Sequence, residues 1–402
     1  MKCIGEEVDM KSANSCNINS FFAVVRQEFK MIFTDSGVLL ILVFAMLIYT
    51  TIYSLAYGNE VVRNVAIAVV DDDNSPTSRT LVNSLRSGPN TEVRYEVSTL
   101  AEAKSLFYSR DVFGVVVIPD GFERDIIAGK AANIATILDG SHLLIYRQVL
   151  EQATKDALTN GATIEVMRLV SKGANDIEAM EIAQPVAYDG HTLHNPSMGY
   201  GSFVMPSIVV VIIQQTLLIG LAMLGVRRRE RPMIQLNPIM SVVAKMLVYM
   251  IIYGINLTII LGIVWPVFGF PYEGETSDVI VVFALYIIAS SALGLSLSHL
   301  FAKRETPLML LLWSSVPILL LAGVSYPKEA FPGWLYILGK IFPSSSAVNA
   351  YVNIGTAGAS LTDVSTDVVI LLILAIVYTT IAILAEKRML SYNIHISDNQ
   401  RV

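Results

Sequence analysis

The chain has 402 residues, of which 53% are hydrophobic and 15% are charged, and its mean hydropathy is +0.57. These values exclude an ordinary soluble protein and favour one that crosses a membrane several times. The formal net charge is −6, but residues 58–200 carry 19 Asp and Glu against 12 Lys and Arg, a balance of −7, so the rest of the chain carries +1. An acidic domain and the lack of a basic tract argue against nucleic acid as a partner.

Before the first long apolar run, apolar residues recur at helical spacing, at Ile18, Phe22, Val25, Phe29 and Ile32. Arg26, Glu28 and Lys30 fall on the other faces. The pattern predicts an amphipathic helix within residues 1–37 that lies in the inner membrane interface and is separated from the first span by residues 34–37. Two interpretations stay open: a membrane anchor alone, or a platform that also contacts a cytoplasmic partner.

Six stretches reach the length of about 20 apolar residues that a helix needs to cross a bilayer. They are Val38–Tyr57, Phe203–Val226, Ile239–Phe268, Val279–Leu300, Pro307–Val324 and Asp367–Ala385. The first of them, residues 38–57, is too long and begins too late in the chain for a cleaved signal peptide. The sequence therefore predicts a polytopic α-helical membrane protein with six transmembrane helices.

The charges of the short loops predict the orientation of these helices. Basic residues follow the second, fourth and sixth stretches, at Arg227, Arg228, Arg229, Arg231, Lys303, Arg304, Lys387 and Arg388. The loop Pro271–Asp278 has acidic residues and no base. The excess of bases in cytoplasmic loops predicts that both termini, including the tail 391–402, are cytoplasmic and that residues 58–200 are external, which means periplasmic in a bacterium with two membranes. Lys245, near the start of the third stretch, is expected to reach back to the cytoplasmic interface.

Residues 58–200 alternate between strand and helix patterns. The predicted strands are Val65–Val70, Glu92–Val97, Phe113–Ile118 and Asn133–Leu138, and a long helix is predicted from Ser141 to Val170. Strands that alternate with helices are typical of an α/β fold. We therefore expect an inserted external α/β domain between the first and second spans.

The acidic run Asp71–Asp73 invites a metal interpretation, but consecutive side chains at a strand end point in different directions. The spacing of a calcium loop is also absent, so Asn74–Pro76 is better interpreted as a turn and a helix start. His191 and His194 have no convincing carboxylate or cysteine companion. No phosphate-binding Gly-x-x-x-x-Gly-Lys-Ser/Thr motif occurs. We expect no metal, no catalytic site and no bound cofactor on this chain.

Prolines and a glycine interrupt the apolar region after the fifth stretch, at Gly323, Pro327, Pro332 and Pro343, with Trp334 between the last two. Each proline removes a backbone donor and clashes with the preceding turn. We therefore expect a re-entrant or interfacial hairpin near residues 326–345 on the outer side. This motif resembles the signature of the type-2 ABC transporter permeases. The chain also resembles one subgroup of that family, whose members have one span, a large external domain and then five spans. In this chain the five spans are expected within residues 201–390.

The resemblance implies a permease subunit of an ATP-driven exporter, with ATP bound by a separate ATPase subunit and a second permease copy or paralogue alongside. It also implies that the ATPase contacts the interfacial helix and the loop before span three. The corresponding residues are Phe22, Phe29, Arg227, Arg228, Arg229, Arg231, Gln235, Leu236, Asn237 and Pro238. Pro232 stands where the family has a Gly-Thr pair. The alternative for the arginines is a role in membrane orientation alone, and both roles are compatible.

Gln214, Gln215 and Asn256 are the most deeply placed polar residues of the spans. Buried amides usually form hydrogen bonds between helices, and a substrate path is the alternative. We expect a hydrophobic or amphipathic substrate, a drug or a lipid, exported across a bacterial inner membrane. The resemblance also suggests a periplasmic adaptor and an outer-membrane channel as partners. The alternative function is a non-transporting membrane scaffold or receptor whose external domain binds protein partners.

Overall fold

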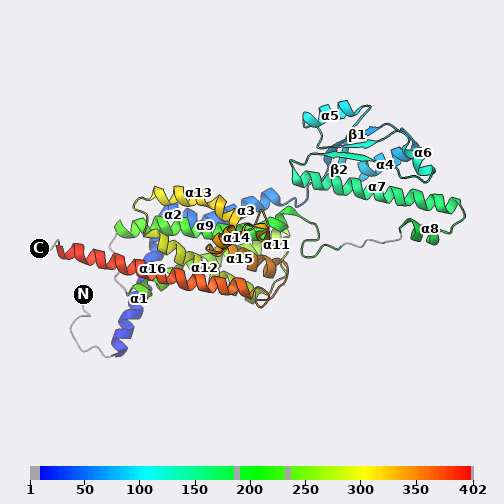
Figure 1. Cartoon of the computed structure of the whole chain (residues 1–402). Helices are drawn as coiled ribbons and strands as arrows, with labels where there is room; N and C mark the ends of the chain where they lie inside the picture. Colours follow the sequence, from blue (N-terminus) through cyan, green and yellow to red (C-terminus); the bar gives the residue numbers. More distant parts are fainter. Residues whose placement is uncertain (1–9, 185–190, 231–236, 400–402) are drawn as a thin grey trace. The chain divides into compact units, whose positions relative to one another are not determined.

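Two units make up the part of the chain that the computed structural model describes, which is residues 10–184, 191–230 and 237–399 (Figure 1). The helical unit contains the chain up to Glu60 and from Thr192 onward. The α/β unit runs from Val61 to His191. The α/β unit is therefore an insertion in the sequence of the helical unit.

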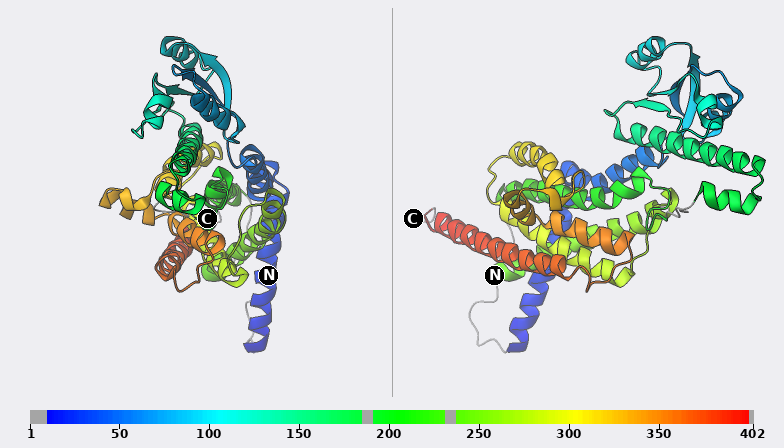
Figure 2. Two further views of the ribbon diagram at one scale, coloured as in Figure 1. Left: turned by 90° about the vertical axis from the view of Figure 1, so that its right-hand side faces the viewer. Right: turned by 45° about the vertical axis from the view of Figure 1, so that its right-hand side comes forward.

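The helical unit begins with a helix that is separate from the first span. The elements in order are α1 (Met10–Phe33), α2 (Ser36–Leu39), the π-helical turn η1 (Leu40–Phe44) and α3 (Ala45–Tyr57). Asp35 is the N-cap of α2, because its side chain accepts a hydrogen bond from the Val38 amide at 3.2 Å. α1 runs at a steep angle to the rods that follow (Figure 2). The predicted separate helix is confirmed, and its place in the membrane interface stays a prediction.

Among the described residues, five helical segments, which we call rods, are long and apolar enough to cross a membrane. They are α2–α3, α9 (Tyr200–Glu230), α10 (Pro238–Ile259) with the π-helical turn η2 (Ile260–Val264) and α11 (Trp265–Phe268), α12 (Thr276–Ser298) and α16 (Ser365–Asn399). The apolar window of α9 is 89% buried, far more than that of any other rod, so α9 is the central helix of the unit. Five of the six predicted stretches thus have the required length and composition.

The sixth stretch, predicted as a span over Pro307–Val324, forms α13 (Glu305–Leu321), which has 17 residues. At 1.5 Å per residue such a helix is about 25 Å long, less than the roughly 30 Å of a bilayer core. Gly323 follows it with a left-handed φ of 80°, so the helix cannot continue through the last predicted residues. The count of six full spans is not confirmed.

Short helices follow α13 in place of a continuous crossing. They are η3 (Lys328–Ala330), α14 (Gly333–Lys340), α15 (Pro343–Tyr351) and the π-helical turn η4 (Val352–Thr356). Pro327 and Pro332 stand directly before η3 and α14, and Pro343 occupies the first turn of α15, where its missing N–H has no helical partner to lose. Trp334 is 69% exposed on α14. The predicted interruption by these residues is confirmed, and entry of the hairpin into a membrane stays a prediction.

The substitution Gly323→Ala is expected to destabilise this hairpin by roughly 1–2 kcal/mol, since side chains disfavour a left-handed backbone. A Cβ at this position would also lie 2.5 Å from two carbons of the Lys328 side chain. Thermal unfolding of the purified protein in detergent measures the effect. Gly333→Ala is the matched control, because its Cβ would meet no heavy atom within 4 Å. An equal loss of stability in both variants would contradict the expectation.

The α/β unit consists of β1 (Val65–Asp71), α4 (Pro76–Ser87), β2 (Thr91–Val97), α5 (Leu100–Tyr108), β3 (Gly114–Ile118), α6 (Phe122–Ile127), β4 (Ala135–Leu138), α7 (Leu143–Ser171) and α8 (Asp176–Ala183). The strand order is β2-β1-β3-β4, with β1 parallel to β2 and β3, and β4 antiparallel to β3. The four predicted strands and the long helix are all present. The central strand β1 is apolar on both faces because α4 and α7 cover one face and α5 covers the other.

The acidic run after β1 starts two helices. Asp71 accepts hydrogen bonds from the Asn74 amide at 3.0 Å and from the Ser78 hydroxyl at 2.7 Å. Asp73 accepts one from the Glu123 amide, in the first turn of α6, at 3.1 Å. Ser75 caps α4, and Pro76 occupies its first turn. The predicted turn and helix start is confirmed.

The chain leaves and re-enters the helical unit at one place. The Tyr200 amide donates to the Glu60 carbonyl at 2.9 Å, and the Ser202 hydroxyl donates to the Glu60 carboxylate at 2.9 Å. The rings of Tyr57 and Tyr200 also pack edge to face, with centroids 5.2 Å apart. Because Tyr200 begins α9, this junction lies at the opposite end of α9 from its terminal arginines.

Candidate functional site

Three consecutive arginines end α9, and each contacts a different part of the helical unit. Neighbouring residues of a helix point about 100° apart, so Arg227, Arg228 and Arg229 reach different neighbours. Arg227 contacts the turn before α2, Arg228 contacts α1 and α10, and Arg229 contacts the residue after α12. The arginine run therefore joins helix ends that are far apart in the sequence.

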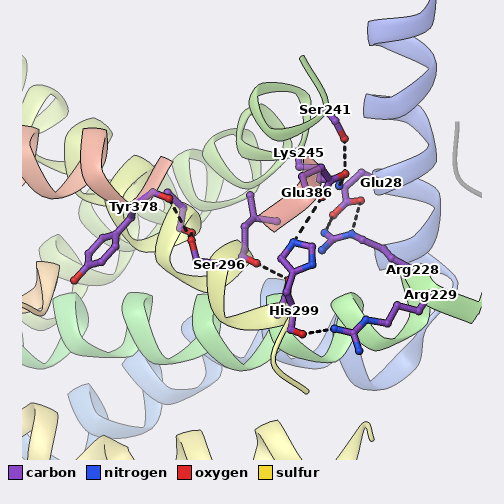
Figure 3. A network of polar contacts seen from close by, with 12 residues as sticks. Glu28, Arg228, Arg229, Ser241, Lys245, Ser296, His299, Tyr378 and Glu386 are labelled. Carbon is purple, nitrogen blue, oxygen red and sulfur yellow. Dashed lines mark hydrogen bonds and ion pairs between the residues drawn. The ribbon is translucent and has the colours of Figure 1, made fainter. Parts of the chain in front are cut away.

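Arg228 forms a buried ion pair with Glu28, which joins α9 to α1 (Figure 3). Arg228 Nε lies 3.3 Å from Glu28 Oε2, and Arg228 Nη2 donates to the other carboxylate oxygen. The Tyr249 hydroxyl accepts a hydrogen bond from Arg228 at 2.7 Å and donates one to Glu28. Glu28 is fully buried and Arg228 is 4% exposed. Because a buried charge is stable only beside its partner, this pair fixes α1 on α9.

A second buried group joins α10 to α16 beside the first (Figure 3). Lys245 Nζ donates to Glu386 Oε1 at 2.6 Å, and the Ser241 hydroxyl donates to the same oxygen at 2.9 Å. Lys245 is only 1% exposed, so the expectation that it reaches back to the membrane interface is wrong. The carboxylate of Glu386 neutralises the ammonium group inside the protein, and the side chain has no need to extend to water.

A third group lies in the turn between α1 and α2. Asp35 accepts hydrogen bonds from Arg227 Nη1 at 2.9 Å and from Arg304, which precedes α13. Burial alone would raise the pKa of Asp35, but hydrogen bonds from Arg304 and the Val38 amide, together with the two guanidinium charges, outweigh it and lower that pKa. Asp35 therefore stays ionised and holds the end of α9 and the start of α13 at the first span.

His299 follows α12 and lies beside the second group. Its Nε2 is 3.7 Å from Glu386 Oε2, and its carbonyl oxygen accepts a hydrogen bond from Arg229. Burial lowers the pKa of His299, the charge of Glu386 opposes the shift, and the charges of Arg228 and Lys245 add to it. With its pKa below the ordinary value of 6.5, the imidazole is neutral at pH 7.

We call these groups the ion-pair layer, which consists of the acids Glu28, Asp35 and Glu386 and the bases Arg227, Arg228, Lys245 and Arg304. The layer joins α1, α9, α10, α16 and the segment before α13 at one end of the helical unit. Because buried pairs resist separation, a displacement of α1 moves these helix ends together. Among the described residues, no group of three or more His, Cys, Asp and Glu side chains is placed to hold a metal ion.

Comparison with known proteins identifies the family of the chain. Residues 36–384 match the profile of the ABC-2 family transporter proteins, which covers most of the chain. The chain belongs to the ABC-2 transporter family. It is therefore a multi-pass membrane protein of the kind that forms the permease part of ABC transporters.

Individual relatives of this ABC-2 permease are similar over most of its length. The probable multidrug ABC transporter permease YbhR of Escherichia coli (strain K12) is 23% identical over 334 residues, which cover 80% of this chain and 86% of YbhR. The inner membrane transport permease YhhJ of the same strain is 22% identical over 390 residues, covering 92% and 98%. ABC transporter G family member 23 of Dictyostelium discoideum is 21% identical over 295 residues, covering 71% of this chain and 41% of that protein.

The position of Glu28 in this permease differs from the prediction. The sequence pattern predicts that Glu28 lies on a polar face of the first helix, whereas the structure buries it in the face formed by Val24, Met31 and Ile32. Glu28 stands four residues from Val24 and four from Ile32, which is the spacing of one helical stripe. A charged residue within an apolar stripe was the available signal, since such a residue is seldom fully buried without a partner.

The predicted ATPase contacts on α1 lie in different surroundings. Phe22 is 61% exposed, whereas Phe29 is partly buried against the core of the helical unit. The three arginines 227–229 are engaged within the chain, as described above. Phe22 is therefore the predicted contact on this helix that is most accessible to a partner.

The loop before α10 is described only at its end. Asn237 caps α10, because its side chain accepts a hydrogen bond from the Ile239 amide at 3.1 Å, and Pro238 occupies the first turn. Arg231 and the pair Gln235 and Leu236 lie outside the described residues. Contact with an ATPase stays a prediction for all the residues in question.

The three predicted substrate-path residues are buried inside the helical unit. Gln214 accepts a hydrogen bond from the Ser344 amide at 2.9 Å, which joins α9 to α15. Asn256 donates to the Val43 carbonyl at 3.2 Å, which joins α10 to η1. The side-chain amide of Gln215 has no partner among the described residues. Gln214 and Asn256 thus bridge helices, and a substrate path stays a prediction.

Proposed function

We propose that this chain is the permease subunit of an ATP-driven exporter and that a separate ATPase subunit binds and hydrolyses the ATP. Membership of the ABC-2 family supports the transport role. The sequence lacks a phosphate-binding loop motif, which supports ATP hydrolysis on another chain. The observation that carries the proposal is the ion-pair layer, because it joins α1 directly to α9 and α10 and, through Lys245 on α10, to α16.

In the proposed mechanism, closure of two ATPase subunits on ATP presses on α1 and on the segment between α9 and α10. The Glu28–Arg228 pair passes this displacement to α9. Because the apolar window of α9 is 89% buried, its movement changes the packing of all the helices around it. The resulting rigid-body shift opens a path between two permease copies.

The proposed orientation puts the ion-pair layer on the cytoplasmic side. The bases in the last turn of α9, after α12 and beyond the apolar part of α16 favour this side under the positive-inside rule. The junction at Glu60 and Tyr200 lies at the other end of α9, which supports an external α/β unit. Both termini are then cytoplasmic, and the membrane is the bacterial inner membrane.

The proposed substrate is a hydrophobic or amphipathic molecule, a drug or a lipid, that moves outward. The YbhR relative is described as a probable multidrug permease, which supports this class. A second copy or a paralogue of the chain completes the pathway. The α/β unit would offer the surface for a periplasmic adaptor and, through it, an outer-membrane channel.

The substitution Phe22→Ser is expected to lower the amount of co-expressed ATPase subunit that stays bound to the tagged chain by about tenfold, because burial of an aromatic side chain at the contact is lost. The rate of ATP hydrolysis by the complex should fall with it. Phe203→Ser is the matched control, because Phe203 is 60% exposed, against 61% for Phe22. Phe203 lies in the first turn of α9, at the opposite end of that helix from the ion-pair layer.

Equal retention of the ATPase by both variants and the unsubstituted chain would place the contact elsewhere. If no ATPase subunit binds any of the three proteins, the exporter proposal fails and the result supports the alternative, a membrane scaffold or receptor. A readout of both binding and hydrolysis separates a lost contact from a contact that persists without coupling.

A further inference from the structure

A groove with basic and apolar walls lies at the end of the helical unit that carries the ion-pair layer. Its volume is about 870 Å³. It is lined by Arg229, Ser296, His299, Leu300, Ile381, Leu384, Ala385, Arg388 and Met389. We call this the basic groove. It lies between the ends of α9 and α12 and residues 381–389 of α16, and nothing in the proposed coupling mechanism requires it.

The charge of the basic groove is positive. Arg229 and Arg388 supply two guanidinium groups, and Arg229 is held in place because it donates a hydrogen bond to the His299 carbonyl (Figure 3). Glu386 is an acid near the groove, because it contacts His299, which lines the groove. Its carboxylate already accepts hydrogen bonds from Lys245 and Ser241. Among the side chains that the structure describes, no carboxylate forms an ion pair with Arg229 or Arg388, so both guanidinium charges are available to an anion from outside the chain.

The remaining wall of the groove is apolar and exposed. Leu300 is 74% exposed, Leu384 is 55% exposed and Ile381 is 45% exposed. Ile381 and Leu384 precede Arg388 on α16 by about two turns and one turn, so an apolar strip leads along the helix to the charged end. The groove thus offers a place for an anion at one end and for a hydrocarbon chain along the rest.

The position of the groove matches the boundary between hydrocarbon and headgroups. Arg229, Ser298 and Met389 are the last residues of three of the membrane-crossing segments, and the groove lies at these ends. Basic pockets between transmembrane helices at this level bind anionic lipid headgroups. Arginine suits a phosphate because its planar donors match two phosphate oxygens.

We propose that the basic groove binds an anionic phospholipid, with the phosphate at Arg229 and Arg388 and an acyl chain along Ile381 and Leu384. Of these four residues, Arg229 is also a predicted ATPase contact, whereas Arg388, Ile381 and Leu384 belong neither to that contact nor to the predicted substrate path. It lies next to the ion-pair layer, since His299 faces the groove and Glu386. Bound lipid therefore restrains the end of α16 against α9 and α12.

Native mass spectrometry of the purified full chain tests this site. The protein is solubilised with equal amounts of phosphatidylglycerol and phosphatidylcholine, and the retained lipids are counted. We expect the unsubstituted chain to retain phosphatidylglycerol in preference. Arg388→Gln should reduce this preference by about fivefold, as expected for the loss of one basic residue at the membrane surface. Lys387→Gln should leave it unchanged, because Lys387 is an exposed neighbour on the same helix that does not line the groove.

Ala385→Trp gives a second route to the same answer. The bulky side chain occupies the groove without removal of a charge, and Ala385 is partly exposed, so the helical unit has room for the change. This variant should also lose the preference for phosphatidylglycerol. Its unfolding temperature, compared with that of the unsubstituted chain, shows whether it is folded.

Three results would overturn the proposal. Equal retention of both lipids by the unsubstituted chain would show that the groove does not select anionic lipid. Displacement of phosphatidylglycerol by glycerol phosphate at the same concentration would show that the groove recognises a phosphate without its acyl chain. If Arg388→Gln releases a co-purified ATPase subunit and leaves lipid retention unchanged, the groove is a protein contact.

Discussion

Substitution of Glu28 by glutamine is expected to destabilise the helical unit by about 3–5 kcal/mol, because it leaves the charge of Arg228 buried without a partner. Glutamine has nearly the shape of glutamate, so packing is kept while the negative charge is lost. Arg228 is 4% exposed and cannot recover the loss from water. The change in unfolding temperature of the purified protein in detergent measures the effect.

The control for this prediction removes the whole group. The combined variant Glu28→Leu, Arg228→Met and Tyr249→Phe removes both charges and the hydroxyl of this group, so none of the three is left buried without a partner. Apolar residues of similar volume often replace a buried ion pair at little cost, so most of the lost stability should return. An unfolding temperature of the Glu28→Gln variant equal to that of the unsubstituted chain would show that the pair does not hold α1.

The second large effect is expected at the contact between α9 and α12. A Cβ on Gly225 would lie 2.6 Å from the Cβ of Ser298 and 2.8 Å from its carbonyl oxygen. Neither atom can rotate away, because both are fixed to the backbone of α12. Gly225→Ala should therefore push the two helices apart and cost about 1–3 kcal/mol, as overpacking of a core does. It should also weaken the hydrogen bond from Arg229 to the His299 carbonyl, because Arg229 lies one turn after Gly225 and His299 directly follows Ser298.

Thermal unfolding in detergent again gives the measurement, and Gly254→Ala is its control. Gly254 lies within α10, but a Cβ there would meet no heavy atom within 4 Å. Alanine is a better helix former than glycine, so this control should be neutral or slightly stabilising. Equal destabilisation by both substitutions would mean that loss of glycine, and not the close approach of α9 and α12, is responsible.

Local patterns were sufficient to predict most of the fold. The strands β1 and β3 are apolar runs between turn residues, and such runs identify a buried strand without knowledge of its neighbours. Asn74–Pro76 carries the residues that begin a helix and was recognised for that reason. The five membrane-crossing rods were predicted from length and hydropathy alone.

The ion-pair layer was beyond such patterns, because its partners are far apart in the sequence. Glu28 and Arg228 are 200 residues apart, and Lys245 and Glu386 are 141 residues apart. A lysine near the end of a span, such as Lys245, can either extend its ammonium group to water or pair with an acid inside the protein. The sequence does not show which of the two applies. The predicted end of the stretch Pro307–Val324 lies three residues beyond the end of α13 at Leu321, because hydropathy does not register the left-handed turn at Gly323.

The junction at Glu60 and Tyr200 has a consequence for the evolution of this permease. The hydrogen bonds between these residues, and from Ser202 to Glu60, join the end of α3 to the start of α9 without any contribution from the residues between them. An insertion at such a point leaves the surrounding helices intact. The α/β unit can therefore be exchanged, trimmed or enlarged among relatives while the helical unit stays the same.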